Sequence, residues 1–98
     1  MFDIKSEVKS LEEEVISLRR DFHQNPELGY REFETSKKVK EYLSALGLED
    51  IKTVTKTGVT AILRGSKTGK TVMLRADMDA LPVEEKTGLP FASRNKGV

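Results

Sequence analysis

Cysteine is absent from this chain of 98 residues, and histidine occurs once. Without cysteine there is no disulfide scaffold and no thiol chemistry. One histidine is also too few soft ligands for a complete zinc site within these residues. Proline and glycine occur in ordinary numbers and apolar residues recur regularly. We therefore expect a folded chain rather than a disordered one.

Long apolar runs are absent as well. No stretch approaches the roughly 20 residues that a membrane-spanning helix needs. The first residues become charged at once, which is unlike a signal peptide. We therefore expect a cytoplasmic protein of one small domain's size, with no membrane partner.

Charge is balanced overall but not along the chain. Residues 1–50 carry a net charge of −4, and residues 51–98 carry +5. A basic half could bind nucleic acid, but its only aromatic residue is Phe91, so it offers no platform on which bases could stack. Its lysines lie mostly in expected turns. We interpret them as solvated side chains and expect no nucleic-acid partner.

Two helices are predicted in the first half. The first carries six apolar residues in steps of three and four, which is typical of a helix that docks on a core. A coiled-coil seam is the alternative, but Pro26 ends the run early. The second helix, over about residues 31–45, should end at Gly47, which is free to adopt positive φ. The two stripes are Ile4, Val8, Leu11, Val15, Leu18 and Phe22, and Phe33, Ser36, Val39, Leu43 and Leu46.

Three strands are predicted next, over residues 51–55, 59–64 and 71–76. We expect the first two to pair as an antiparallel hairpin with the third beside it. The third contains Val72, Met73 and Leu74, apolar on both faces, so we expect a strand covered on both sides. The expected fold class is α/β, with two N-terminal helices packed on three strands.

A phosphate-loop pattern at residues 65–71 is rejected. A P-loop needs a glycine five positions before its Gly-Lys pair, and here that position is Arg64. A P-loop also opens a helix, whereas the residues that follow are predicted to form a strand. We interpret this segment as a polar turn.

Asp77 and Asp79 follow directly on the third predicted strand. Carboxylates at a strand end can bind a cation, orient a histidine ligand or accept a proton. They can equally cap a turn or pair with Arg75. A phosphatase of the haloacid-dehalogenase type is a further alternative, although that motif usually lies near the start of its chain.

His23 lies at the end of the first predicted helix, where a helix dipole favours a cationic imidazole. A single histidine in such a place is more often a capping or packing residue than a catalyst. We therefore treat His23 as structural.

Four stretches together resemble a known family. They match the N-terminal part of the metal-dependent amidohydrolases that include hippurate hydrolase, N-acyl-amino-acid amidohydrolase and indole-acetyl-amino-acid hydrolase. This group is a branch of the aminoacylase and glutamate-carboxypeptidase superfamily. The resemblance begins near residue 5 and covers nearly the whole chain. The stretches are Arg19-Arg20-Asp21-Phe22-His23 with Pro26-Glu27-Leu28-Gly29, then Thr57-Gly58-Val59, then residues 74–82 (Leu-Arg-Ala-Asp-Met-Asp-Ala-Leu-Pro), then residues 84–93.

The resemblance implies metal-assisted hydrolysis of an N-acyl amino acid to a carboxylic acid and an amino acid. Two divalent ions (zinc, manganese or nickel) acidify a water, and a glutamate takes its proton. Asp79 matches the aspartate that supports the metal centre, and it is the one catalytic residue assigned. Asp77 stands where the wider superfamily has a ligand histidine, so no metal ligand is assigned. Glu84 and Glu85 match a loop.

In this family a Cys-Gly-His-Asp-Gly-His segment, which supplies metal ligands, follows shortly after the position of Val98. We therefore expect residues 1–98 to be the N-terminal portion of a zinc-peptidase-like catalytic domain, truncated before its main metal-ligand segment. Alone it should be inactive and bind no metal, while the longer enzyme should be a homo-oligomer. The alternative is an independent, non-catalytic binding or assembly module on the same framework.

Overall fold

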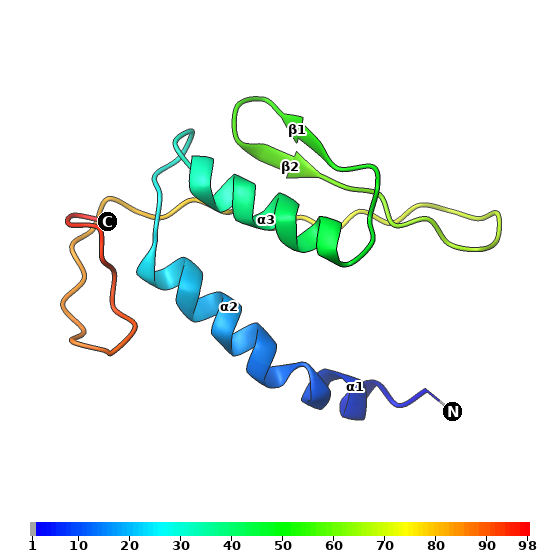
Figure 1. The fold of residues 1–98 in the computed structure, drawn as a ribbon, viewed down its shortest axis with the longest axis horizontal. Coiled ribbons are helices and arrows are strands. Elements are labelled where there is room, and N and C mark those ends of the chain that lie inside the picture. The colour runs from blue at the N-terminus through cyan, green and yellow to red at the C-terminus, as the bar shows by residue number, and fades with distance from the viewer. Residues whose placement is uncertain (1) are drawn as a thin grey trace. The chain divides into compact units, whose positions relative to one another are not determined.

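The computed structural model describes residues 2–98 of the chain. It contains three helices and two strands in the order α1 (Ile4–Ser10), α2 (Glu12–Gln24), α3 (Phe33–Ala45), β1 (Lys52–Val54) and β2 (Gly58–Thr60) (Figure 1). These residues form two compact units. Unit 1 comprises residues 2–26 and Pro82–Val98, and unit 2 comprises Glu27–Leu81. The predicted α/β class is confirmed.

In unit 1 the first predicted helix is two helices, separated at Leu11. This residue has φ −96° and ψ −3°, and it is both the last cap of α1 and the first of α2. The Ser10 hydroxyl donates to the carbonyl of Glu7 at 2.7 Å, and such bonds compete with helical ones. Ile4, Val8 and Val15 are exposed, so this part of the predicted stripe does not dock on a core within the described residues.

Helix α2 ends as its sequence predicts. The Asn25 cap has left helical geometry, with φ −123° and ψ 57°, as expected for a residue that precedes proline. Its backbone N–H still donates to the carbonyl of Asp21 at 3.1 Å, and its side-chain amide donates to the same oxygen at 2.9 Å. The helix therefore ends at Asn25 while its last turn stays hydrogen-bonded.

In unit 2, α3 ends in a Schellman motif. The N–H of Leu48 donates to the carbonyl of Leu43 at 3.2 Å, and the N–H of Gly47 donates to that of Ser44 at 3.0 Å. Gly47 adopts φ 94°, which confirms the predicted stop. Of the predicted inner stripe, Ser36 is buried, whereas Phe33 and Leu46 at the two ends are exposed.

The predicted antiparallel hairpin is confirmed, with shorter strands. Lys52 lies opposite Thr60, and Val54 lies opposite Gly58. Beyond the strands, Arg64 and Asp50 form an ion pair at 2.6 Å that joins the two arms. The hairpin packs beside α3 (Figure 1), and Lys40 donates to the Thr53 hydroxyl at 3.0 Å.

The prediction of a third strand over residues 71–76 is wrong. Residues 71–76 form no strand, and Val72, Met73 and Leu74 are 83%, 85% and 94% exposed. A strand needs a neighbour to satisfy its N–H and C=O groups. Within residues 2–98, the backbone between 61 and 81 pairs with another segment at one bridge, Leu28 with Ala80. An apolar run can predict a strand but cannot supply its partner.

Candidate functional site

The stretch that carries Asp79 lies against the stretch after α2. Leu28 and Ala80 form a parallel bridge, and the N–H of Ala80 donates to the carbonyl of Glu27 at 2.8 Å. A Cβ placed on Gly29 would lie 3.6 Å from Oδ2 of Asp79, so the carboxylate lies beside this glycine. Two motifs more than 50 positions apart in the sequence are thus brought together.

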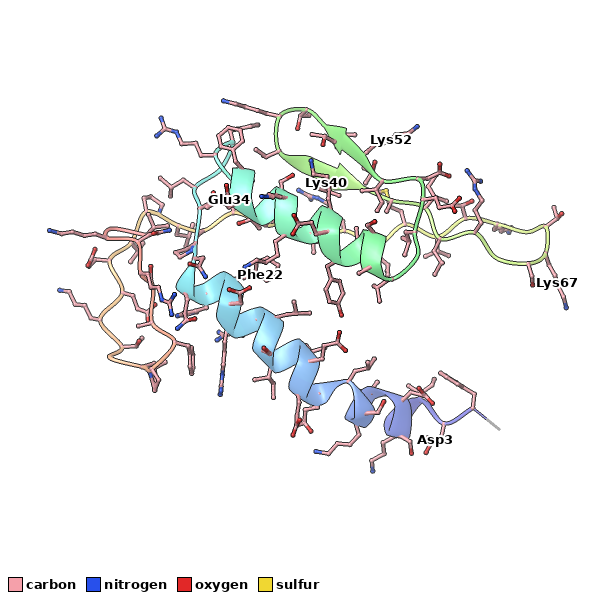
Figure 2. All side chains as sticks on the ribbon, viewed as in Figure 1. Asp3, Phe22, Glu34, Lys40, Lys52 and Lys67 are labelled. Atoms are coloured by element: carbon pink, nitrogen blue, oxygen red, sulfur yellow. The ribbon has the colours of Figure 1, made fainter. Side chains whose placement is uncertain are left out.

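Glu27 caps α3 from outside the helix. Its Oε1 accepts hydrogen bonds from the backbone N–H and the hydroxyl of Thr35, both at 2.6 Å, and its Oε2 accepts from the N–H of Glu34 at 3.2 Å. Glu34 lies in the first turn of α3 (Figure 2). Partial burial raises the pKa of Glu27, but these hydrogen bonds outweigh it and hold the pKa below its usual range. Glu27 is therefore an ionised anchor for this helix end.

A buried polar pair ties the hairpin to the same helix end. Glu32 and Thr57 are 8% and 4% exposed, and the Thr57 hydroxyl donates to Oε1 of Glu32 at 3.3 Å. Thr57 belongs to the turn between β1 and β2, where Thr55 adopts φ 56°. The turn motif singled out in the sequence therefore contacts the N-cap residue of α3.

Asp77 and Asp79 have different surroundings. Asp77 pairs with Arg75 at 3.0 Å, which confirms that Arg75 pairs with one of the two carboxylates. Both partners are largely exposed, and exposed pairs contribute little to stability. Asp79 is exposed beside Gly29, and Tyr30, which follows this glycine directly, adopts φ 64° with 72% of its surface exposed.

In unit 1, His23 pairs with Glu85. Nε2 of His23 lies 2.7 Å from Oε1 of Glu85, which also accepts from the N–H of Ser93 at 3.0 Å. The Thr87 hydroxyl donates to the other carboxylate oxygen. Led by the Thr87 hydroxyl and the Ser93 N–H, these donors hold the pKa of Glu85 below its usual range. The sequence reasoning left both residues in structural roles and missed the pair, because no local pattern links positions 62 apart.

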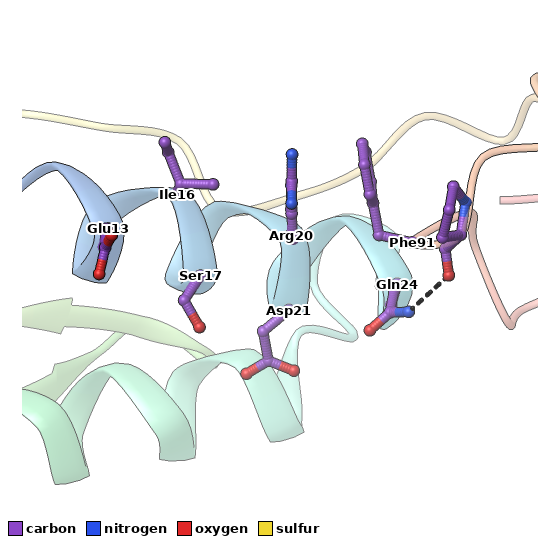
Figure 3. A pocket seen from close by; sticks show the side chains of 8 residues that line it. Glu13, Ile16, Ser17, Arg20, Asp21, Gln24 and Phe91 are labelled. Carbon is purple, nitrogen blue, oxygen red and sulfur yellow. Dashed lines mark hydrogen bonds between the residues drawn. The ribbon is translucent and has the colours of Figure 1, made fainter.

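A shallow hollow of about 560 Å³ lies along one side of α2, also in unit 1 (Figure 3). The guanidinium carbon of Arg20 lies 4.4 Å from the ring centroid of Phe91, a cation–π geometry. The Gln24 amide donates to the carbonyl of Pro90 at 3.3 Å, and the His23 ring meets the Phe91 ring edge-on. The hollow is lined by Glu13, Ile16, Ser17, Arg20, Asp21, Gln24, Pro90 and Phe91.

Metal ligands do not gather among the described residues. In residues 2–98 there is no group of three or more His, Cys, Asp or Glu side chains that could hold an ion. The donor set present here therefore does not fit a metal centre by itself. In the same part of the chain, no helix combines the length and apolar character that crossing a membrane requires.

Comparisons with known proteins show what this chain is similar to. The chain is 52% identical over 96 residues to thermostable carboxypeptidase 2 of Saccharolobus solfataricus, covering 97% of this chain and 24% of that protein. It is 48% identical to N-acetyl-L-cysteine deacetylase of Bacillus subtilis, covering 93% of this chain and 22% of that protein. A crystal structure of a dinuclear metal-binding peptidase of the M20 family, also from Bacillus subtilis, superimposes with a TM-score of 0.83 at 44% identity, covering 91% of this chain and 25% of that one.

Over about nine-tenths of its length, the chain is similar to a peptidase of the M20 family. No family model matches the chain. These matches confirm the resemblance to metal-dependent amidohydrolases, and nothing in them supports the phosphatase alternative. The chain spans about a quarter of the length of the curated relatives that it matches.

Proposed function

We propose that residues 1–98 are the N-terminal portion of the catalytic domain of a longer M20 amidohydrolase that cleaves N-acyl amino acids. The observation that carries this proposal is the identity of about half with a carboxypeptidase and a deacetylase over more than nine-tenths of the chain. The two names share one chemistry, the hydrolysis of an amide whose nitrogen belongs to an amino acid. The products are a carboxylic acid and an amino acid.

Within this function we assign Asp79 a supporting role in the active site. Its carboxylate is exposed beside Gly29 on a stretch anchored by the bridge between Leu28 and Ala80. It is therefore accessible to a ligand side chain from outside the described residues, and carboxylates commonly orient ligand histidines in this way. Two divalent ions would acidify the attacking water in the longer enzyme. Residues 2–98 lack a ligand set, so the metal ligands of the proposed enzyme must come from other residues.

An independent binding module is the weaker proposal. Among the described residues no apolar side chain is fully buried, and many large apolar side chains are exposed. A domain that folds alone buries most of its large apolar side chains, each worth about 1.5–3 kcal/mol. This pattern favours a segment whose apolar surface is covered by further chain. We further propose that the longer enzyme is a cytoplasmic homo-oligomer.

A chimera tests the proposed function. Residues 2–98 replace the matching quarter of the Bacillus subtilis N-acetyl-L-cysteine deacetylase, and hydrolysis of N-acetyl amino acids is measured with zinc, manganese or nickel added. We expect turnover within about tenfold of the parent enzyme, since interface mismatches rather than lost catalytic groups should set the difference. A folded, metal-loaded chimera without hydrolysis would refute the proposal. The 98-residue chain alone is expected to be inactive under the same conditions.

A further inference from the structure

Glu27 is bonded in two directions. Its carboxylate holds the start of α3 through Glu34 and Thr35, and its backbone carbonyl accepts the N–H of Ala80 at 2.8 Å. The residue before Ala80 is Asp79. One residue, through its side chain and its backbone, thus connects the N-terminus of a helix to the stretch that carries the proposed catalytic carboxylate.

The cap on α3 is an unusual one. A helix is commonly capped by the side chain of its own N-cap residue. Here that residue is Glu32, which makes no capping hydrogen bond and instead accepts from Thr57. The cap comes from Glu27, eight positions before Thr35. A local cap would stabilise α3 equally well, but it would leave the stretch around Asp79 unconnected to the helix.

The bridge to Ala80 is a single contact. No ladder extends it within the described residues, so residues 77–81 depend on this one backbone pairing with Leu28 and Glu27. Each residue has only two soft backbone dihedrals, so fixing Ala80 restricts its neighbour Asp79. The bonds of the Glu27 side chain hold the backbone of Glu27 in place. Through Ala80, they therefore also hold the backbone of Asp79, which sets where its carboxylate lies.

We propose that Glu27 is a positioning residue for Asp79, holding the Asp79 stretch in place by anchoring it to the N-terminus of α3. The proposal rests on the assigned role of Asp79. It adds a residue that acts through the backbone and touches neither substrate nor metal.

Amide hydrogen exchange in the chimera described above tests the proposal. Glu27→Ala should speed exchange at the Ala80 amide by about tenfold or more, because a charge-assisted anchor is lost. It should also move the carboxyl carbon resonance of Asp79. Glu27→Gln keeps an oxygen that can accept from Thr35, so Ala80 should exchange within about threefold of the unaltered chimera. The matched control is Glu34→Gln in the same turn of α3, which should leave Ala80 unchanged.

The outcomes separate positioning from simple capping. If Glu27→Ala exposes the Thr35 amide to exchange but leaves Ala80 protected, Glu27 is only a cap and the proposal is overturned. An Ala80 amide without protection in the unaltered chimera would overturn it too. If Glu27→Ala unfolds unit 2, Thr35→Val decides: it removes the hydroxyl donor, and Ala80 should then exchange about threefold faster. No change at Ala80 in that variant refutes the proposal.

These measurements do not use activity. A chimera without hydrolysis would refute the proposed function and leave the link between Glu27 and Ala80 intact. Conversely, if the chimera is active but Glu27→Ala does not change the exchange rate of the Ala80 amide, only the positioning role is refuted.

Discussion

The imidazole of His23 and the carboxylate of Glu85 meet at 2.7 Å although 62 positions separate them in the sequence. The contact joins the end of α2 to the loop that follows Pro82, both within unit 1. The same carboxylate oxygen accepts a hydrogen bond from the N–H of Ser93. One atom therefore connects two parts of the loop to each other and to the helix. Through His23, Thr87 and Ser93, the Glu85 carboxylate therefore holds this loop against the helix.

Glu85 should make unit 1 sensitive to acid. Its donors favour the ionised form and depress its pKa in the folded state, led by the Thr87 hydroxyl. The stability that this provides is present above the unfolded pKa of about 4.3 and is lost as the pH falls through the lower, folded value. Protection of the Ser93 amide should collapse over that acid range, and Glu85→Gln should flatten the dependence. Glu84→Gln is the matched control and should keep the pH dependence of Ser93 protection. An unchanged pH dependence in Glu85→Gln would contradict the conclusion that ionised Glu85 stabilises unit 1 against acid.

Asp79→Ala in the chimera should lower turnover by at least about a hundredfold, as losses of supporting and proton-transfer groups often do. Asp77→Ala should leave turnover within about threefold, because Asp77 forms an exposed pair with Arg75 that contributes little. Steady-state hydrolysis of N-acetyl amino acids measures both. Turnover in Asp79→Ala like that of the unsubstituted chimera would show that this aspartate is merely structural.

Thr57→Val should destabilise unit 2 by about 1–3 kcal/mol, because it leaves the buried Glu32 carboxylate without the hydroxyl donor. Thr60→Val is the control: Thr60 lies exposed in β2, and the change should cost less than about 0.5 kcal/mol. Urea unfolding followed by the helical circular dichroism of the chimera measures the difference. Equal midpoints for the two variants would count against a stabilising role for the buried pair.

The isolated chain should self-associate through residues 71–76. This stretch combines exposed apolar side chains with an unpaired backbone, which is the property of an open strand edge. Leu74→Lys should reduce association in sedimentation velocity measured over a concentration series. Val8→Lys, an equally polar change on α1 where the helix satisfies its own backbone, should reduce it less. A monomeric unaltered chain at every concentration would disprove this expectation.

Sequence reasoning located the features that local chemistry determines. Gly47 ends α3 because positive φ is a property of glycine, and Pro26 ends α2 because it restricts Asn25. The hairpin followed from its turn. The break at Leu11 was missed because the apolar periodicity continues across it.

The candidate site was only partly predictable for a related reason. The resemblance pointed to Asp79, whose role stays a prediction, but nothing in the sequence placed Glu27 between Thr35 and Ala80. Likewise His23 and Glu85 each have an ordinary local setting, and only the fold makes them partners. Hydrogen bonds between distant carboxylates and donors leave no periodic pattern to detect. The prediction of a third strand was wrong for the opposite reason. Its apolar pattern is clear, but the described residues contain no segment that pairs with it.

The lack of fully buried apolar side chains among the described residues has a calorimetric consequence. The heat capacity of unfolding comes mainly from apolar surface newly exposed to water, and for an ordinary domain of this size it is about 1.2–1.5 kcal/mol/K. Much of that surface is already hydrated in this chain. Its unfolding should therefore have a small heat capacity change, and its stability curve should be shallow, with neither a sharp thermal melt nor a pronounced cold limb.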